Sequence, residues 1–326
     1  MREALIWVLV DERAGTAAQA LGVAEALGRP FVEKPLRYDG LARLPNILRG
    51  ASLIGVDAYT RARLTPPWPD LVIAAGRRAA PVARWIKAQA DKPVVLAQVM
   101  NPGRRGAGDF SLIALPNHDC EVPGGDAANV MRVTGAPHRV TGGKLERAAE
   151  AWKGSLGGLP RPYIVVLVGG STHQRPFPVE HARDLGTGVA AMARGVGGSV
   201  LVTTSRRTGA EAEQALAETI PEPRALFRWG QAGDNPYLGW LGLADAIVVT
   251  GDSVSMACEA CATQAPVFIY APPGLVVPKH ARLHRELYER GFARPFDGQW
   301  AEWDHPPLNA ATDIADALSP LIAALT

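Results

Sequence analysis

Short apolar runs recur along this chain, and most are followed by a turn rich in Gly, Ser or Thr and then by a helical stretch. The runs lack polar alternation, which is typical of parallel strands that helices cover on both faces. Alternating strands and helices predict an α/β fold with an open, doubly wound sheet. In the first half, strands are expected at Leu5–Val10, Leu71–Ala75, Val94–Val99 and Phe110–Leu115, and helices at Ala17–Leu27 and Ala79–Gln89.

The pattern restarts after a Gly- and Pro-rich segment at 154–162, which is typical of a linker. The length of 326 residues also favours two domains of ordinary size. We therefore predict an N-terminal Rossmann-like domain at 1–153, a second at 154–305, and a closing helix within 306–326 that packs back on the first domain. Strands of the second domain are expected at Tyr163–Val168, Ser199–Thr203, Arg224–Phe227, Ala246–Val249 and Pro266–Ile269, with a helix near His181–Arg194.

Charge and cysteine content narrow the classes of partner. Lys+Arg total 34 and Asp+Glu total 32, so the net charge of +2 argues against a nucleic-acid surface. There are three cysteines, Cys120, Cys258 and Cys261. A small, odd number of cysteines does not make a disulfide framework, which favours a reducing cytoplasm. The apolar run Ala4–Val10 is too short to span a membrane.

The sharpest chemical motif is the turn after the strand Ala246–Val249. The strand breaks at Gly251, two hydroxyl residues follow at Ser253 and Ser255, and a helix begins that carries Glu259. Unpaired N–H groups at a helix N-terminus suit a phosphate, and a glutamate one turn later can reach ribose hydroxyls. The alternative is that one of the two serines simply caps the helix.

Similar turns follow other strands, and strands of one domain bring such turns together. Glycines allow close backbone approach, while hydroxyl and arginine side chains suit a diphosphate. Each of these features has a purely structural explanation: the glycines can form a tight turn, the arginines can lie in a solvated basic turn, and the tryptophan can be a packing residue. The further binding candidates are Gly170, Ser171, Thr172, Ser205, Arg206 and Trp229 in the second half, and Gly15 and Gly76 in the first.

Other cofactor and metal motifs are missing from the sequence. There is no GxGxxG fingerprint and no Walker motif, which argues against a standard NAD dehydrogenase or a P-loop ATPase. Cys258 and Cys261 form a CxxC, but no second ligand pair has the spacing that zinc requires. We expect these to be core cysteines and expect no metal site.

Several segments together resemble a known family: Asp11 with Gly15, Gln19 and Gly22; Ala74–Arg78; Val168–Gly170; Thr203–Thr208; and Thr250–Glu259. They look like the bacterial relatives of the mitochondrial fission protein ELM1, a family name that describes a cellular phenotype rather than a reaction. The resemblance spans nearly the whole chain. It implies a glycosyltransferase-B (GT-B) fold, with two Rossmann-like domains facing across a cleft and a nucleotide sugar bound there. Gly251, Ser253, Ser255 and Glu259 match that superfamily's donor pattern by position.

The resemblance also implies a reaction, which the residues alone do not. A glycosyltransferase of this type takes its catalytic base from the N-terminal domain, where Asp11, Glu12, Asp109 and His118 are the candidates, and needs no metal or other cofactor. The acceptor is not identified by the sequence; an envelope glycan or lipid would bring the protein to the inner membrane as a peripheral protein. Two alternatives stay open: a non-hydrolysing nucleotide-sugar 2-epimerase, and a non-catalytic interaction protein.

Overall fold

The structure is a computed structural model, and it describes residues 3–103, 105–119 and 127–325, so Cys120 lies outside the described residues. The chain forms two compact units. Unit 1 comprises Met1–Arg139 together with Asn309–Thr326, and unit 2 comprises Val140–Leu308. In the described part of the chain, no helix has the length and apolar content needed to cross a bilayer.

Unit 1 is built on a six-stranded parallel sheet with the strand order β2-β1-β3-β4-β5-β6. The strands are β1 (Ile6–Asp11), β2 (Val32–Leu36), β3 (Leu71–Ala75), β4 (Val95–Val99), β5 (Leu112–Pro116) and β6 (Val130–Val133). The longer helices are α1 (Ala14–Ala26), α4 (Gly76–Gln89) and α11 (Ala310–Ala323). Short helical turns are η1 (Gly40–Arg43), α2 (Asn46–Arg49), α3 (Ala58–Arg61), η2 (Ala107–Asp109) and η3 (Asn117–Asp119).

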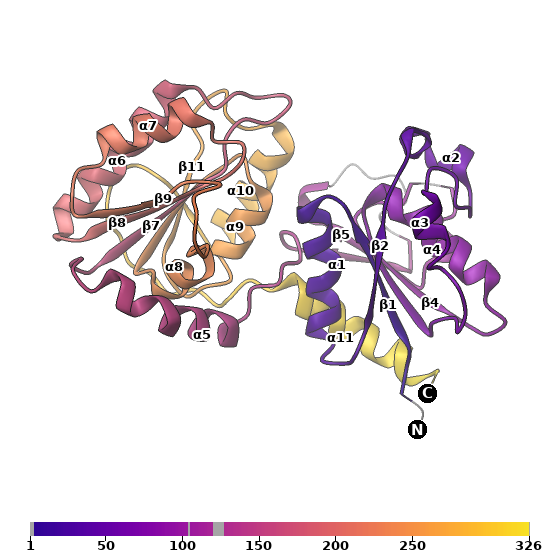
Figure 1. Cartoon of the computed structure of the whole chain (residues 1–326). Helices are drawn as coiled ribbons and strands as arrows, with labels where there is room; N and C mark the ends of the chain where they lie inside the picture. The colour runs from indigo at the N-terminus through magenta and orange to yellow at the C-terminus, as the bar shows by residue number, and fades with distance from the viewer. Residues whose placement is uncertain (1–2, 104, 120–126, 326) are drawn as a thin grey trace. The chain divides into compact units, whose positions relative to one another are not determined.

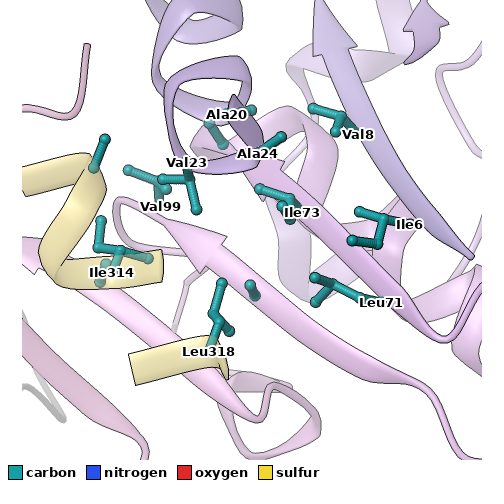
Figure 2. Packing of buried hydrophobic residues seen from close by; sticks show 14 of the residues in the cluster. Ile6, Val8, Ala20, Val23, Ala24, Leu71, Ile73, Val99, Ile314 and Leu318 are labelled. Atoms are coloured by element: carbon teal, nitrogen blue, oxygen red, sulfur yellow. The ribbon is translucent and has the colours of Figure 1, made fainter. Parts of the chain in front are cut away.

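The sheet of unit 1 is covered on both faces, as the uninterrupted apolar runs predicted. Ile6 and Val8 of β1 face one core with α1 and α11, whereas Trp7 and Leu9 face the other core with α4. Figure 2 shows Ile314 and Leu318 of α11 packed among side chains of the sheet. The last helix of the chain is therefore part of the first core.

Two strands of unit 1 had no counterpart in the apolar pattern. The edge strand β2 has the sequence VEKPL, with charged residues and a proline, and most of its side chains are exposed. The other edge strand, β6, has only one buried residue, Val133. Edge strands lack the second neighbour that would bury them, so they tolerate polar residues and proline that hide the strand signal.

Unit 2 contains a second six-stranded parallel sheet, with the order β12-β11-β10-β7-β8-β9, and Figure 1 shows α6 and α7 on one side of it and α5 and α8 on the other. The strands are β7 (Tyr163–Val168), β8 (Ser199–Thr204), β9 (Arg224–Phe227), β10 (Ala246–Thr250), β11 (Val267–Tyr270) and β12 (Arg294–Pro295). The helices are α5 (Gly142–Lys153), η4 (Gly154–Leu156), α6 (Val179–Val196), α7 (Ala210–Thr219), α8 (Tyr237–Leu243), α9 (Val254–Ala260) and α10 (Pro278–Glu289).

The units divide at Arg139 and Val140, earlier than the Gly- and Pro-rich segment at 154–162 on which we based a boundary. The physical reason is the packing of α5 on α8. A Cβ atom at Gly242 would lie 2.5 Å from the Leu145 carbonyl oxygen, and one at Gly239 would lie 2.4 Å from Trp152 Cδ1. Two glycines of α8 thus let α5 approach closely, and α5 belongs to unit 2. The other end of unit 2 is Leu308 rather than residue 305.

The position of α11 leads to a stability prediction. Leu318 is fully buried, so Leu318→Ala should lower the free energy of unfolding of unit 1 by about 2–5 kcal/mol, through lost burial and the cavity that remains. Hydrogen exchange detected by mass spectrometry measures this loss of stability. The variant should increase the exchange rate more in β1 and β3 than in β7. Asp316→Ala, an exposed change on the same helix, is the control. Faster exchange confined to unit 2 would contradict the assignment of α11 to the first core.

Candidate functional site

The strand order of unit 2 reverses beside β7. The chain builds outward through β8 and β9 and then returns to the other side of β7 as β10. Open α/β sheets bind ligands at the carboxyl ends of the strands next to such a reversal, because the two loops there diverge and leave a crevice. Here the loops after β7, β8 and β10, which we call the switch-point loops, begin at Gly169, Ser205 and Gly251.

Asp252 joins the switch-point loops. Its side chain is fully buried, and its Oδ2 accepts hydrogen bonds from the Gly170 N–H (3.0 Å) and from Arg207 Nη1 (2.6 Å). The same arginine donates to the carbonyls of Gly170 and Ser171. Asp252 Oδ1 is buried and has no hydrogen-bond partner. One carboxylate therefore fixes three loops relative to one another.

Gly170 is required for this arrangement. Its φ is +125°, and a Cβ atom there would lie 2.2 Å from the Arg207 carbonyl oxygen. The loop after β8 thus packs directly on the backbone of the loop after β7, which no side chain at position 170 would allow.

Gly251 lies against α10 rather than open to solvent. A Cβ atom there would lie 2.6 Å from His284 Cε1 and 3.0 Å from the Ala271 Cβ. The close approach that this glycine permits is therefore that of α10. We expected it to make room for a phosphate; the structure gives the residue a packing role at this position.

Most hydroxyl groups of the switch-point loops bond to the protein itself. Ser171 Oγ accepts from the Phe177 N–H (2.9 Å), and Thr172 Oγ1 accepts from the Arg175 N–H (3.1 Å). Ser205 Oγ donates to the Gly169 carbonyl and accepts from the Arg207 N–H. Ser253 Oγ caps α9 by accepting from the Met256 N–H (3.4 Å), the structural alternative recognised in the sequence. These groups order the loops.

Other side chains at the carboxyl edge remain available to a ligand. Arg206 is exposed at the loop after β8. Trp229 follows β9 and is 57% exposed, while its backbone N–H donates to Thr204 Oγ1 (2.8 Å). Ser255 is partly exposed in the first turn of α9. The edge therefore combines a cation, an aromatic face and a hydroxyl group.

Glu259 is paired with Tyr237. The tyrosine Oη donates to Glu259 Oε2 (2.5 Å), which connects α8 to α9. Burial raises the pKa of Glu259, and the Tyr237 hydrogen bond acts in the opposite direction. Burial also raises the pKa of Tyr237 well above its ordinary value, so the phenol stays protonated and acts as a donor. The pair orients a carboxylate one turn after the β10–α9 turn.

Two histidines of α10 face the switch-point loops. His284 is buried, and burial lowers its pKa to about 4 despite a hydrogen bond to the Gly251 backbone. His280, one turn earlier, has a lowered pKa mainly because of burial; Asp252 raises this pKa, while Lys279 and Arg207 lower it. His280 Nδ1 is buried without a hydrogen-bond partner. Both imidazoles are therefore neutral at pH 7.

Sequence reasoning missed Asp252 and His280 as parts of this edge. Asp252 lies inside the Thr250–Glu259 motif, but that motif assigned phosphate contacts to the serines beside it and no role to the aspartate. An aspartate between a buried strand and a short helix was the available signal, because an acid there must find a partner. His280 had no signal, since only the fold brings α10 over the loop after β10.

The candidates in unit 1 are spread over two edges of its sheet. Asp11 ends β1, is buried, and forms two hydrogen bonds with Arg78, at 2.5 and 3.2 Å, while Glu12 lies 3.7 Å from the same arginine. Gly15 is in the first turn of α1, and Gly76 begins α4 with φ +75°. These four residues all lie at the carboxyl ends of β1 or β3 or just beyond them.

Asp109 and His118 lie on either side of β5. Asp109 precedes the strand and forms an ion pair with Arg84 (2.5 Å), so it lies at the amino end. His118 follows the strand in η3 and is buried. The structure therefore brings His118, but not Asp109, to the carboxyl edge where Asp11 and Glu12 lie.

The two described cysteines are free thiols in the core. Cys258 and Cys261 are completely buried in and after α9, and burial raises the pKa of Cys261 well above its ordinary value. Across residues 3–103, 105–119 and 127–325, no group of three or more His, Cys, Asp or Glu side chains is placed to hold a metal ion.

A family model decides the relationship of this chain. Residues 14–321 match the family described as mitochondrial fission ELM1. The chain belongs to this family. Among relatives, it is 29% identical to the mitochondrial fission protein ELM1 of Arabidopsis thaliana over 312 residues, covering 89% of this chain and 72% of the plant protein. It is 26% identical to the uncharacterized protein RP120 of Rickettsia prowazekii, covering 96% and 97%.

Solved structures share the fold of this ELM1-family chain. The UDP-GlcNAc 2-epimerase of Methanocaldococcus jannaschii has a TM-score of 0.56 at 10% identity, covering 98% of this chain and 99% of the epimerase. The glycosyltransferase SnogD of Streptomyces nogalater has a TM-score of 0.51 at 13% identity, covering 98% and 95%. The chain has the GT-B-like α/β fold with two Rossmann-like units, as the sequence predicted.

The contact of Gly251 with α10 leads to a prediction. Gly251→Ala should destabilise unit 2 by about 1–3 kcal/mol, because the new methyl group would overlap with His284. Chemical denaturation, monitored through hydrogen exchange in β10, measures the loss of stability. Gly195→Ala is the control, because nothing lies within 4 Å of its Cβ position in α6. Equal stability of the two variants would show that Gly251 does not pack on α10.

The buried imidazole predicts a pH dependence. The pKa of His284 falls from 6.5 to about 4 on folding, so between these values the unfolded chain binds a proton that the folded chain does not. Stability of unit 2 should therefore decrease as the pH falls through this window, by up to about 3 kcal/mol from this group. The measurement is denaturation against pH for the wild type and for His284→Asn, whose profile should be flatter. Parallel profiles would contradict a neutral, buried His284.

Proposed function

We propose that this chain binds a nucleoside diphosphate sugar at the carboxyl edge of unit 2 and transfers the sugar to a hydroxyl acceptor. The observation that carries the proposal is the joining of the switch-point loops by Asp252 and Arg207. A catalytic or binding crevice needs loops held in one geometry, and here they are held at the strand reversal where α/β sheets bind ligands.

The available groups match the parts of such a donor. The exposed Trp229 offers a face on which a base can stack. Glu259 offers a carboxylate that can accept from ribose hydroxyls, with Tyr237 fixing its orientation. Arg206 supplies a positive charge for the diphosphate, and Ser255 supplies a hydroxyl donor. In this proposal the two histidines of α10 are neutral, so the arginines alone offset the negative charge of the diphosphate.

The reaction is a substitution at the anomeric carbon of the sugar. The acceptor oxygen forms a bond to that carbon while the bond to the diphosphate oxygen breaks, and the acceptor's proton passes to a base. The departing nucleoside diphosphate keeps the electron pair, and positive charge and N–H groups at the carboxyl edge stabilise it. No redox partner is required.

The solved relatives support the ligand class only by analogy. A second structure of the Methanocaldococcus jannaschii epimerase, with a TM-score of 0.54 at 12% identity, is described as a complex with UDP-GlcNAc and UDP. That binding is a property of the epimerase. We carry the ligand class over as part of this proposal because the same kind of fold places loops at the same kind of edge.

Binding is tested with UDP, GDP, CMP and TDP by calorimetric titration, followed by variants with the best of them. Arg206→Ala should weaken binding by about 1.5–3 kcal/mol, or roughly 10- to 150-fold in Kd, because a charged hydrogen bond to the diphosphate is lost. Glu259→Gln and Trp229→Ala should weaken the nucleotide but leave free pyrophosphate unchanged. Arg194→Ala, an exposed arginine near the end of α6, should bind as the wild type does.

The outcomes separate the possible functions. Release of nucleoside diphosphate that depends on an added acceptor supports transfer, whereas a changed sugar without acceptor shows epimerisation. If the chain binds no nucleotide and no nucleotide sugar, the result favours a non-catalytic interaction protein. If Arg206→Ala and Trp229→Ala bind as tightly as the wild type, the proposed site is wrong.

A further inference from the structure

Exposed hydrophobic side chains are concentrated in one short stretch of unit 1. In the described residues, nine large hydrophobic side chains are exposed, and six of these lie between positions 41 and 59. The most exposed are Leu48 at 65% and Ile47 at 57%. We call the six the apolar face: Leu41, Leu44, Ile47, Leu48, Ile54 and Tyr59. Scattered exposed apolar residues need no explanation, but a cluster of this kind marks an interaction surface.

The helix α2 at the centre of this face has an inverted pattern. Its polar residues are buried: Asn46 donates to the carbonyls of Arg77 and Pro102, and Arg49 donates to those of Ile54 and Arg78. The two residues between them, Ile47 and Leu48, point outward. A surface helix normally turns its apolar side inward, so this single turn has the reverse of the pattern expected for a helix that faces water.

Hydrogen bonds connect the segments that carry the apolar face. Tyr38 and Val56 form a β-bridge, and the Asp39 N–H donates to the Gly55 carbonyl (3.1 Å), so the segments that lead into η1 and α3 lie side by side. Arg77, at the start of α4, donates to the Leu44 carbonyl (2.7 Å). The face is thus attached to the carboxyl edge of the sheet by hydrogen bonds.

Five exposed arginines lie on the segments that carry the apolar face or beside them, and two of these, Arg37 and Arg63, lie over the ring of Tyr59. In the described part of unit 1, none of them forms an ion pair with a carboxylate. The nearby carboxylates of Asp39 and Asp57 accept backbone N–H groups, from Leu41 (2.8 Å) and Thr60 (2.7 Å). The Thr60 hydrogen bonds lower the pKa of Asp57, and the charges of Arg37 and Arg61 lower it further. The exposed arginines are Arg37, Arg43, Arg61, Arg63 and Arg77.

We propose that this face inserts into the interfacial layer of a membrane that contains anionic lipids. Apolar side chains enter the acyl boundary, and surrounding cations meet anionic headgroups, which is the combination that holds peripheral proteins at membranes. The five exposed arginines outnumber the two nearby carboxylates, Asp39 and Asp57, and this excess of positive charge favours an anionic surface over a neutral one. The proposal does not depend on nucleotide binding, because the face lies in unit 1 and the proposed donor residues lie in unit 2.

The experiment is vesicle flotation of the full chain with phosphatidylcholine vesicles, with or without phosphatidylglycerol. We expect binding only to the anionic vesicles, and release by added salt. The double variant Ile47→Ser/Leu48→Ser should bind at least roughly tenfold more weakly, because it removes the two most exposed side chains of the apolar face. Arg43→Glu should weaken binding to anionic vesicles.

Two controls separate this surface from folding and from the donor site. Leu238→Ser changes an exposed leucine of unit 2 and should float as the wild type does. The double variant should keep the melting temperature and any nucleotide affinity of the wild type, since both side chains are exposed. The proposal is overturned if the wild type binds neither vesicle, if the double variant binds as well as the wild type, or if the face instead mediates self-association in size-exclusion chromatography.

Discussion

The candidate site of unit 2 depends on one buried carboxylate. Beyond the strand ends, single hydrogen bonds rather than a ladder join these loops: the Ser171 N–H donates to the Arg207 carbonyl (2.9 Å), and the Gly169 N–H donates to Thr250 Oγ1 (2.8 Å). Asp252, in the loop after β10, reaches both of the other loops through the Gly170 N–H and Arg207. This ion pair contributes little net stability, because Asp252 loses its hydration completely while Arg207 stays partly exposed. What it contributes is a single loop geometry, in which any other arrangement leaves a charge buried without a partner.

That constraint decides which groups are left for chemistry. Because the hydroxyls of Ser171, Thr172 and Ser205 hold the loops in shape, a ligand meets a more limited set of side chains at this edge. The carboxyl edge of unit 1 is similar, because Arg78 donates hydrogen bonds to both oxygens of Asp11. The same arginine also stacks on Tyr38, with 4.3 Å between the guanidinium carbon and the ring centroid. In both units, charged residues at strand ends act first on the protein itself.

Much of the fold could be predicted from the sequence, because buried parallel strands leave uninterrupted apolar runs. The strands Leu71–Ala75 and Tyr163–Val168 match the structure residue for residue. The edge strand β2 and the helix α5 could not be predicted in this way, since the first is mostly exposed and the second is attached to its unit by the glycines of α8. For the candidate site, the motif around Gly251 lies at the carboxyl edge of the second sheet, beside the strand reversal. The roles of individual residues within it depend on contacts between distant segments, such as Gly251 with His284, which no local pattern reveals.

The return of α11 to the first core has a consequence for synthesis of the chain. Ile314, Leu318 and Ile322 complete the core that α1 and β3 begin, yet they are translated after the whole of unit 2. Unit 2, by contrast, is one continuous segment from Val140 to Leu308. N-terminal domains usually fold first during translation, but here the first core can be completed only after unit 2 has been synthesised. Until then α1 alone covers the face of the first sheet that it shares with α11.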